Sequence, residues 1–145
     1  MRDIDIVYTV DDYWDGPREG IASFRGKPHA YRCLFDEAQD EWSERYRLTP
    51  ISPDALEAAL EAWGIWCRWA SADRAGQAPR GSHPALPHES ERYFHLKAVV
   101  DSAVNENETQ AFIAHGEFAT GASAGSAIHG DPGSLTVVWR VEAAA

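Results

Sequence analysis

The chain is poor in cysteine and has no long apolar run. Its 145 residues include two cysteines, Cys33 and Cys67. Two cysteines do not make a disulfide framework in a chain of this length, so we expect two free thiols. Neither has further metal ligands beside it, which argues against a cysteine-based zinc site, and we expect no cofactor. No apolar run approaches the roughly 18 residues of a membrane-spanning helix, so we expect no membrane association.

Basic side chains are also scarce. Thirteen Lys and Arg stand against 23 Asp and Glu, which gives a formal net charge of −10. A negative field repels phosphate backbones, and no basic stripe reverses it locally. The composition therefore disfavours nucleic-acid binding and favours a basic protein partner. The first residues are charged and lack the apolar stretch of a secretory signal, so the cytoplasm is the expected location.

Aromatic side chains, in contrast, are plentiful. Six Trp, five Tyr and five Phe contribute to a chain that is 44% hydrophobic. This is enough apolar mass for one hydrophobic core, and the length is typical of one domain. We therefore expect a single domain over residues 1–145.

The first 50 residues alternate between apolar and polar positions, as strands do. The alternation predicts four strands, over residues 4–10, 20–24, 29–35 and 42–48. The connections between them are short, so we expect an antiparallel β-meander over residues 1–50. One face of the third strand carries His29, Tyr31, Cys33 and Phe35.

Residues 53–76 give the strongest helix prediction. Ser52 suits the N-cap, Pro53 the first helical position and Gly76 the C-terminal stop. Apolar residues cover most of the circumference, which is typical of a helix buried on more than one side. We expect this helix to cross the sheet and to be covered by another element. Its aromatic residues are Trp63, Trp66 and Trp69.

The remainder of the chain predicts a second helix over 89–104 and two strands within 110–142, separated by a turn-rich segment. The expected fold class is α+β: an antiparallel β-meander packed on a Trp-rich helix, plus a second helix and two C-terminal strands. A partly closed barrel is the alternative, because closure removes the exposed edges of a sheet.

Two connections of the meander are crowded with carboxylates. We expect Tyr13 and Trp14 to hold the first one to the core, and Arg18 to pair with one of its aspartates. The EF-hand spacing of calcium sites fails there, because Tyr13 takes a ligand position. If both connections lie at one end of the meander, they form an acidic rim suited to a cationic protein surface. The candidate binding residues are Asp11, Asp12, Tyr13, Trp14 and Asp15, with Asp36, Glu37, Asp40 and Glu41.

Two further groups of residues are weaker candidates for a functional site. His88, Glu91 and His95 have the spacing of one helix face, and His83 is near in sequence, so these side chains are weak candidates for a zinc site. A solvated helix surface is the simpler interpretation. Residues 121–125 match the G-x-S-x-G pattern of a nucleophilic serine, but a flexible Gly/Ser loop explains them better in so short a chain.

Three stretches resemble a family of small uncharacterised bacterial proteins. They are YWDGPREGIASFRGKPHAYRCLFDE at 13–37, LTP at 48–50 and LEAWGIWCRW at 60–69. The family pattern is similar to YxDGPxxGIAxFxGKPHxYxCxFDE, and the resemblance covers about half of the chain. It implies a bacterial protein with a single domain, and it assigns no activity, cofactor or catalytic residue.

Together these features favour a non-enzymatic interaction module, such as an immunity- or antitoxin-like inhibitor or an adaptor. Aromatic anchors inside a charged rim are typical of protein interfaces. One alternative is a small metal-binding or hydrolytic enzyme that uses the His83, His88, Glu91 and His95 cluster or the loop at 11–20. The other is a small-ligand binder whose pocket is lined by Trp63, Trp66 or Trp69.

Overall fold

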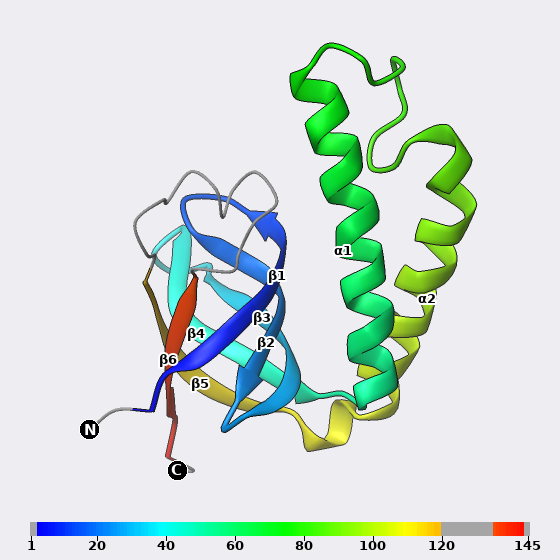
Figure 1. The fold of residues 1–145 in the computed structure, drawn as a ribbon. Coiled ribbons are helices and arrows are strands. Elements are labelled where there is room, and N and C mark those ends of the chain that lie inside the picture. Colours follow the sequence, from blue (N-terminus) through cyan, green and yellow to red (C-terminus); the bar gives the residue numbers. More distant parts are fainter. Residues whose placement is uncertain (1–2, 120–134, 144–145) are drawn as a thin grey trace.

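The computed structural model describes residues 3–119 and 135–143, and six antiparallel strands in it close into a barrel (Figure 1). Each strand pairs with the next along the chain, and β6 returns to pair with β1. The strands are β1 (Asp5–Tyr13), β2 (Pro17–Phe24), β3 (Lys27–Asp36), β4 (Glu41–Pro50), β5 (Phe112–Ala119) and β6 (Thr136–Val141). The four strands predicted in the first 50 residues are confirmed, and the barrel is closed.

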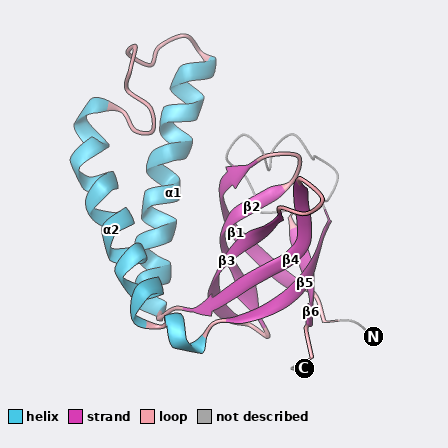
Figure 2. Cartoon of the chain, turned by 180° about the vertical axis from the view of Figure 1, so that it is seen from behind, coloured by secondary structure: helices cyan, strands magenta, loops and turns pink. Residues whose placement is uncertain are grey.

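A helical hairpin is inserted between β4 and β5 and lies beside the barrel (Figure 2). Its helices are α1 (Pro53–Arg74) and α2 (Ser90–Glu106), with short 3₁₀ turns at η1 (Pro87–Glu89) and η2 (Glu108–Gln110). The predicted signals work as expected at α1. Ser52 Oγ accepts a hydrogen bond from the Ala55 amide at 3.1 Å, and Gly76 follows the helix with a left-handed φ of 72°.

Four aromatic rings fill the barrel interior. Their centroids lie between 5.4 and 6.2 Å apart, which is the range of favourable ring contacts. Three of these side chains also donate a hydrogen bond, from a hydroxyl or an indole N–H, to a backbone carbonyl. The accepting carbonyls are those of Thr9, Pro17 and Ser23. The rings belong to Tyr31, Tyr46, Phe118 and Trp139.

A second core lies between the barrel wall and the hairpin. Here α1 contacts β1 on one side and α2 on the other, so it is covered by two elements as predicted, although it runs alongside the wall rather than across a sheet (Figures 1 and 2). The positions that α1 buries are small, apart from one isoleucine. They are Ala55, Ala58, Ala59, Ala62, Ile65 and Ala70.

The tryptophans of α1 do not form this core. Trp63, Trp66 and Trp69 are all half-buried, and alanines make the close helix contacts instead. Trp63 and Trp66 stack on each other with centroids 5.1 Å apart. The Trp-rich helix of the sequence prediction is therefore an alanine-faced helix with tryptophans along its flank, because small side chains allow helices to approach closely.

None of the helices among the described residues is long and apolar enough to cross a membrane. The G-x-S-x-G segment and the rest of the turn-rich stretch at 121–133 lie outside the described residues.

Candidate functional site

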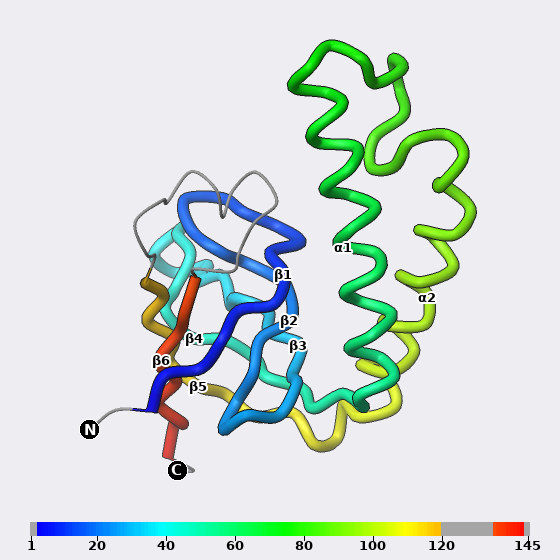
Figure 3. The backbone as a smooth tube through the Cα atoms, viewed as in Figure 1, coloured from blue at the N-terminus to red at the C-terminus, as the bar shows by residue number. Residues whose placement is uncertain are grey.

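Both acidic connections lie at the same end of the barrel (Figure 3). Successive strands of an up-and-down barrel alternate in direction, so the β1–β2 and β3–β4 connections must share an end. The acidic rim required that both connections lie at one end of the meander, and they do. We call this surface the acidic end, and it comprises Asp12, Tyr13, Trp14, Asp15, Phe35, Asp36, Glu37, Asp40 and Glu41.

Aromatic side chains at the acidic end are exposed rather than anchored. Trp14 is 70% exposed and Tyr13 44% exposed, so the prediction that they hold the loop to the core is wrong. Phe35 is 44% exposed as well, and its ring meets that of Trp42 edge to face at 5.1 Å. Single exposed aromatics are common, whereas here three of them lie at the same end of the barrel.

Arg18 holds the β1–β2 connection in place of the two aromatics. Its Nε donates to the Trp14 carbonyl at 2.6 Å and its Nη2 to the Asp15 carbonyl at 2.7 Å. Its guanidinium also lies 5.3 Å from the centroid of the Trp42 ring and 3.4 Å from Cys33 Sγ. Arg18 therefore binds backbone carbonyls instead of the predicted carboxylates, and it fixes the position from which Trp14 projects.

Some of the carboxylates at the acidic end shape the turns. Asp15 and Asp40 take left-handed φ angles of 55° and 53°, which aspartate tolerates better than most residues. Asp36 Oδ1 accepts the amides of Ala38 and Gln39 at 3.0 and 3.2 Å. Asp12, Glu37 and Glu41 have no such role. Within residues 3–119 and 135–143, no ion pair neutralises any carboxylate of the acidic end.

Asp11 is separate from this surface. Its carboxylate lies 3.7 Å from Lys97 Nζ on α2 and accepts a hydrogen bond from Thr9 Oγ1 at 3.3 Å. Burial lowers the pKa of Lys97, but the negative charge of Asp11 and the nearby Tyr93 and Asp101 outweigh burial and raise it. Asp11 thus joins the barrel to the hairpin rather than facing a partner.

The weak metal candidates are not brought together. His83 packs edge to face on Trp69 with centroids 4.7 Å apart, whereas His88 belongs to η1, and Glu91 and His95 are exposed on α2. No group of three or more His, Cys, Asp or Glu side chains suited to a metal occurs in the described part of the chain.

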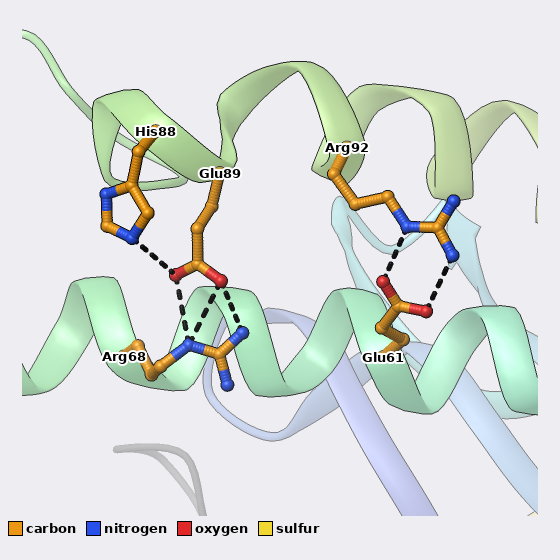
Figure 4. A network of polar contacts seen from close by, with 5 residues as sticks. All are labelled: Glu61, Arg68, His88, Glu89 and Arg92. Atoms are coloured by element: carbon orange, nitrogen blue, oxygen red, sulfur yellow. Dashed lines mark hydrogen bonds and ion pairs between the residues drawn. The ribbon is translucent and has the colours of Figure 1, made fainter.

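Residues beside these candidates instead tie α1 to α2 (Figure 4). Arg92 donates to both carboxylate oxygens of Glu61, at 2.6 and 2.8 Å. Arg68 binds Glu89 in the same way, and this hydrogen bonding lowers the pKa of Glu89. His88 Nε2 lies 3.9 Å from the Glu89 carboxylate. The charged side chains Glu61 and Arg68 of α1 thus both make their ion pairs within the hairpin.

Trp63 and Trp66 line a hollow of about 20 Å³, which has room for about one water molecule, and Trp69 is not part of it. Two larger hollows contain none of these tryptophans. One of about 420 Å³ is lined by Phe24 and Trp139, and another of about 480 Å³ lies between the barrel and α2. Both fall in the size range of small-molecule sites, roughly 300–1,000 Å³.

Sequence reasoning missed Phe35 as part of the acidic end, and it gave Arg18 a carboxylate partner instead of the two backbone carbonyls. Strand alternation grouped Phe35 with His29, Tyr31 and Cys33, and those three are buried as a face of β3 should be. The β3–β4 register shifts between Cys33 and Phe35, at the point where β3 approaches the barrel end. Such an irregularity changes the direction in which a side chain points, and no residue pattern in this segment indicates it.

Comparison with known proteins finds no match to a family model, to a curated protein or to a solved structure. The resemblance of residues 13–37 to small bacterial proteins therefore stays a prediction.

Proposed function

We propose that this protein is a non-enzymatic interaction module of the bacterial cytoplasm that binds a basic protein partner through its acidic end. The single observation behind the proposal is the exposed aromatic group of Trp14, Tyr13 and Phe35, set among carboxylates that lack ion-pair partners in the described residues. An immunity- or antitoxin-like inhibitor, or an adaptor, is the class of protein that fits.

The aromatics supply the affinity in this proposal. Trp and Tyr are the side chains that most often dominate binding energy at an interface, provided that surrounding contacts exclude water. Trp14 projects from a connection that Arg18 holds in a fixed shape, so little conformational entropy is lost when it is buried. The carboxylates supply steering, because a negative rim speeds the approach of a cationic surface and repels anionic ones.

The test is co-purification with the product of the neighbouring gene in the source genome, followed by titration of the purified complex. Trp14→Ala should raise Kd by about 30-fold, the effect of losing an anchor worth about 2 kcal/mol. Phe94→Ala is the matched control, because Phe94 is 55% exposed but lies on α2. A complex that tolerates Trp14→Ala as well as Phe94→Ala would overturn the proposal.

The steering role is tested separately with carboxylates that shape no turn. Replacing Asp12, Glu37 and Glu41 by their amides should slow association and flatten its salt dependence, while the dissociation rate changes little. Leaving Asp15, Asp36 and Asp40 unchanged preserves both turns. An association rate that is insensitive to salt in the unmodified protein would remove the acidic rim from the proposal.

A further inference from the structure

The groove between the outer wall of β1–β4 and the helical hairpin shares no residue with the acidic end, although Asp11 at its edge adjoins Asp12. We propose that it binds a small zwitterionic molecule, one that carries both a free carboxylate and a free ammonium group. The inference is independent of the proposed function, because none of the residues of the acidic end lines this groove.

The groove has the size and construction of a small-molecule site. Its volume is about 480 Å³. Apolar side chains from both walls provide a surface that the uncharged part of a ligand can cover. Charged side chains surround this surface. This combination of apolar surface with a few placed charges is the usual composition of a ligand site. This surface comes from the half-buried Ala30 on the barrel and Val104 on α2, whereas Ile21 and Val100 are buried beneath it.

Two arginines on the barrel side form the positive part. Arg32 and Arg47 stand directly opposite each other on β3 and β4, and both are exposed. Like charges in opposite positions destabilise a strand pair. Arg32 has a distant partner in Glu19, at 3.9 Å, but no carboxylate among the described residues pairs with Arg47. A ligand carboxylate would neutralise this pair, and guanidinium groups bind carboxylates in a bidentate geometry.

The helical side of the groove is negative. Asp101 on α2 and Glu108 on η2 are exposed and have no ion-pair partner within residues 3–119 and 135–143. The one lysine of the groove, Lys97, is already paired with Asp11 at 3.7 Å. Both walls carry charges of each sign, but Glu19 pairs with Arg32 and Asp11 with Lys97. Among the described residues this leaves Arg47 unpaired on the barrel wall and Asp101 and Glu108 unpaired on the helical wall, and a molecule with one charge of each sign complements both.

Trialanine is a suitable probe, because it carries both charges on a small apolar body. Titration into the ¹⁵N-labelled protein should give saturable shifts of the backbone amides of Arg47, Val100 and Asp101. N-acetyl-trialanine lacks the ammonium group and trialanine amide lacks the carboxylate, so each should bind about tenfold more weakly or worse. Shifts that do not saturate, or equal binding of the blocked peptides, would overturn the proposal. Retained binding of the N-acetyl peptide alone would mean an anion site instead.

Variants locate the two charges. Arg47→Gln should weaken trialanine about tenfold and abolish the advantage of trialanine over its amide, while Asp101→Asn should abolish the advantage over the N-acetyl peptide. Arg140→Gln is the control, since Arg140 is an exposed arginine that lines the other large hollow. Unchanged trialanine affinity in Arg47→Gln would contradict the assignment, whether or not a protein partner binds the acidic end.

Discussion

At the scale of single residues, the barrel interior depends on a position with no side chain. Gly20 of β2 lies over the Tyr31 ring, whose hydroxyl donates to the Thr9 carbonyl at 2.9 Å. A Cβ on Gly20 would overlap that carbonyl oxygen and come within 2.7 Å of the Tyr31 hydroxyl. Backbone atoms cannot move aside as the end of a flexible side chain can, so β2 itself would have to shift.

Gly20→Ala should therefore destabilise the protein by about 2 kcal/mol or more, through overpacking against backbone. Urea unfolding measures the loss. Gly64→Ala is the matched control, because Gly64 lies inside α1 and a Cβ there meets only Arg68 Nη1, at 3.6 Å. Alanine should stabilise that position by about 0.5–1 kcal/mol. If both variants shift the urea midpoint in the same direction, the close approach at Gly20 is wrong.

His29 makes stability depend on pH. It is buried between Phe24 and Phe112, with ring centroids 5.3 and 5.8 Å away, and its Nδ1 donates to the Lys27 carbonyl at 2.9 Å. Burial lowers the pKa of His29 below its ordinary 6.5. The neutral ring therefore contributes stability that is present above pH 6.5 and is lost as the pH falls through the lower pKa of the folded state.

The urea midpoint of the native protein should thus drop between about pH 7.5 and pH 5. His29→Phe keeps a ring in the cluster and removes the titrating group, so its midpoint should fall less over the same interval. His88→Gln should behave like the native protein, because the His88 side chain is 76% exposed. An identical pH dependence in His29→Phe would show that other groups cause the drop.

At the scale of elements, the β1–β2 connection is organised by one arginine. Arg18 gathers the Trp14 and Asp15 carbonyls and covers the Trp42 ring, so it joins the connection to β4. A planar guanidinium can satisfy two carbonyls at once, whereas an ammonium presents a single point charge. The shape of the acidic end therefore depends on Arg18 more than on any carboxylate there.

Arg18→Lys should destabilise the protein by about 1–2 kcal/mol and speed hydrogen exchange of the amides from 13 to 16. Arg32→Lys serves as the control, because the Arg32 side chain is 71% exposed and makes one contact of 3.9 Å with Glu19. Its effect should be small. Unchanged exchange at 13–16 in Arg18→Lys would mean that the strands alone hold the connection.

At the scale of the whole molecule, the barrel closes through a short seam. Among the described residues, two pairs define the β1–β6 register, Asp5 with Val137 and Ile6 with Thr136, and the Val7 amide donates to the Leu135 carbonyl at 3.2 Å. The β3–β4 register extends from His29 opposite Pro50 to Asp36 opposite Glu41. Long-range pairing with few backbone contacts gives the lowest local stability, so the seam is where the barrel should open first.

Hydrogen exchange followed by mass spectrometry should therefore show β6 exchanging faster than β3 and β4 under native conditions. A destabilising variant such as Gly20→Ala provides the comparison, because it lowers global stability and should bring the rates of the two regions closer together. Equal protection of β6 and β3 in the native protein would contradict a seam that opens separately.

The sequence determined what depends on near neighbours along the chain. Period-two alternation placed the strands of the first 50 residues, and Ser52 and Gly76 bounded α1, because capping and left-handed turns are local chemistry. The presence of two acidic connections was also visible. The sequence left open whether they share one end, and the barrel answers this because its antiparallel strands alternate in direction.

Only the tertiary structure decided which aromatics are buried and which charges meet. Trp14 was expected to pack on the core and is exposed, while Trp139 helps to fill the barrel, because burial depends on how the six strands close. Arg47 and Asp101 face one groove because an inserted hairpin folds back onto the wall. Such contacts join residues far apart in sequence. They depend on the packing of the whole chain, so no local sequence pattern predicts them.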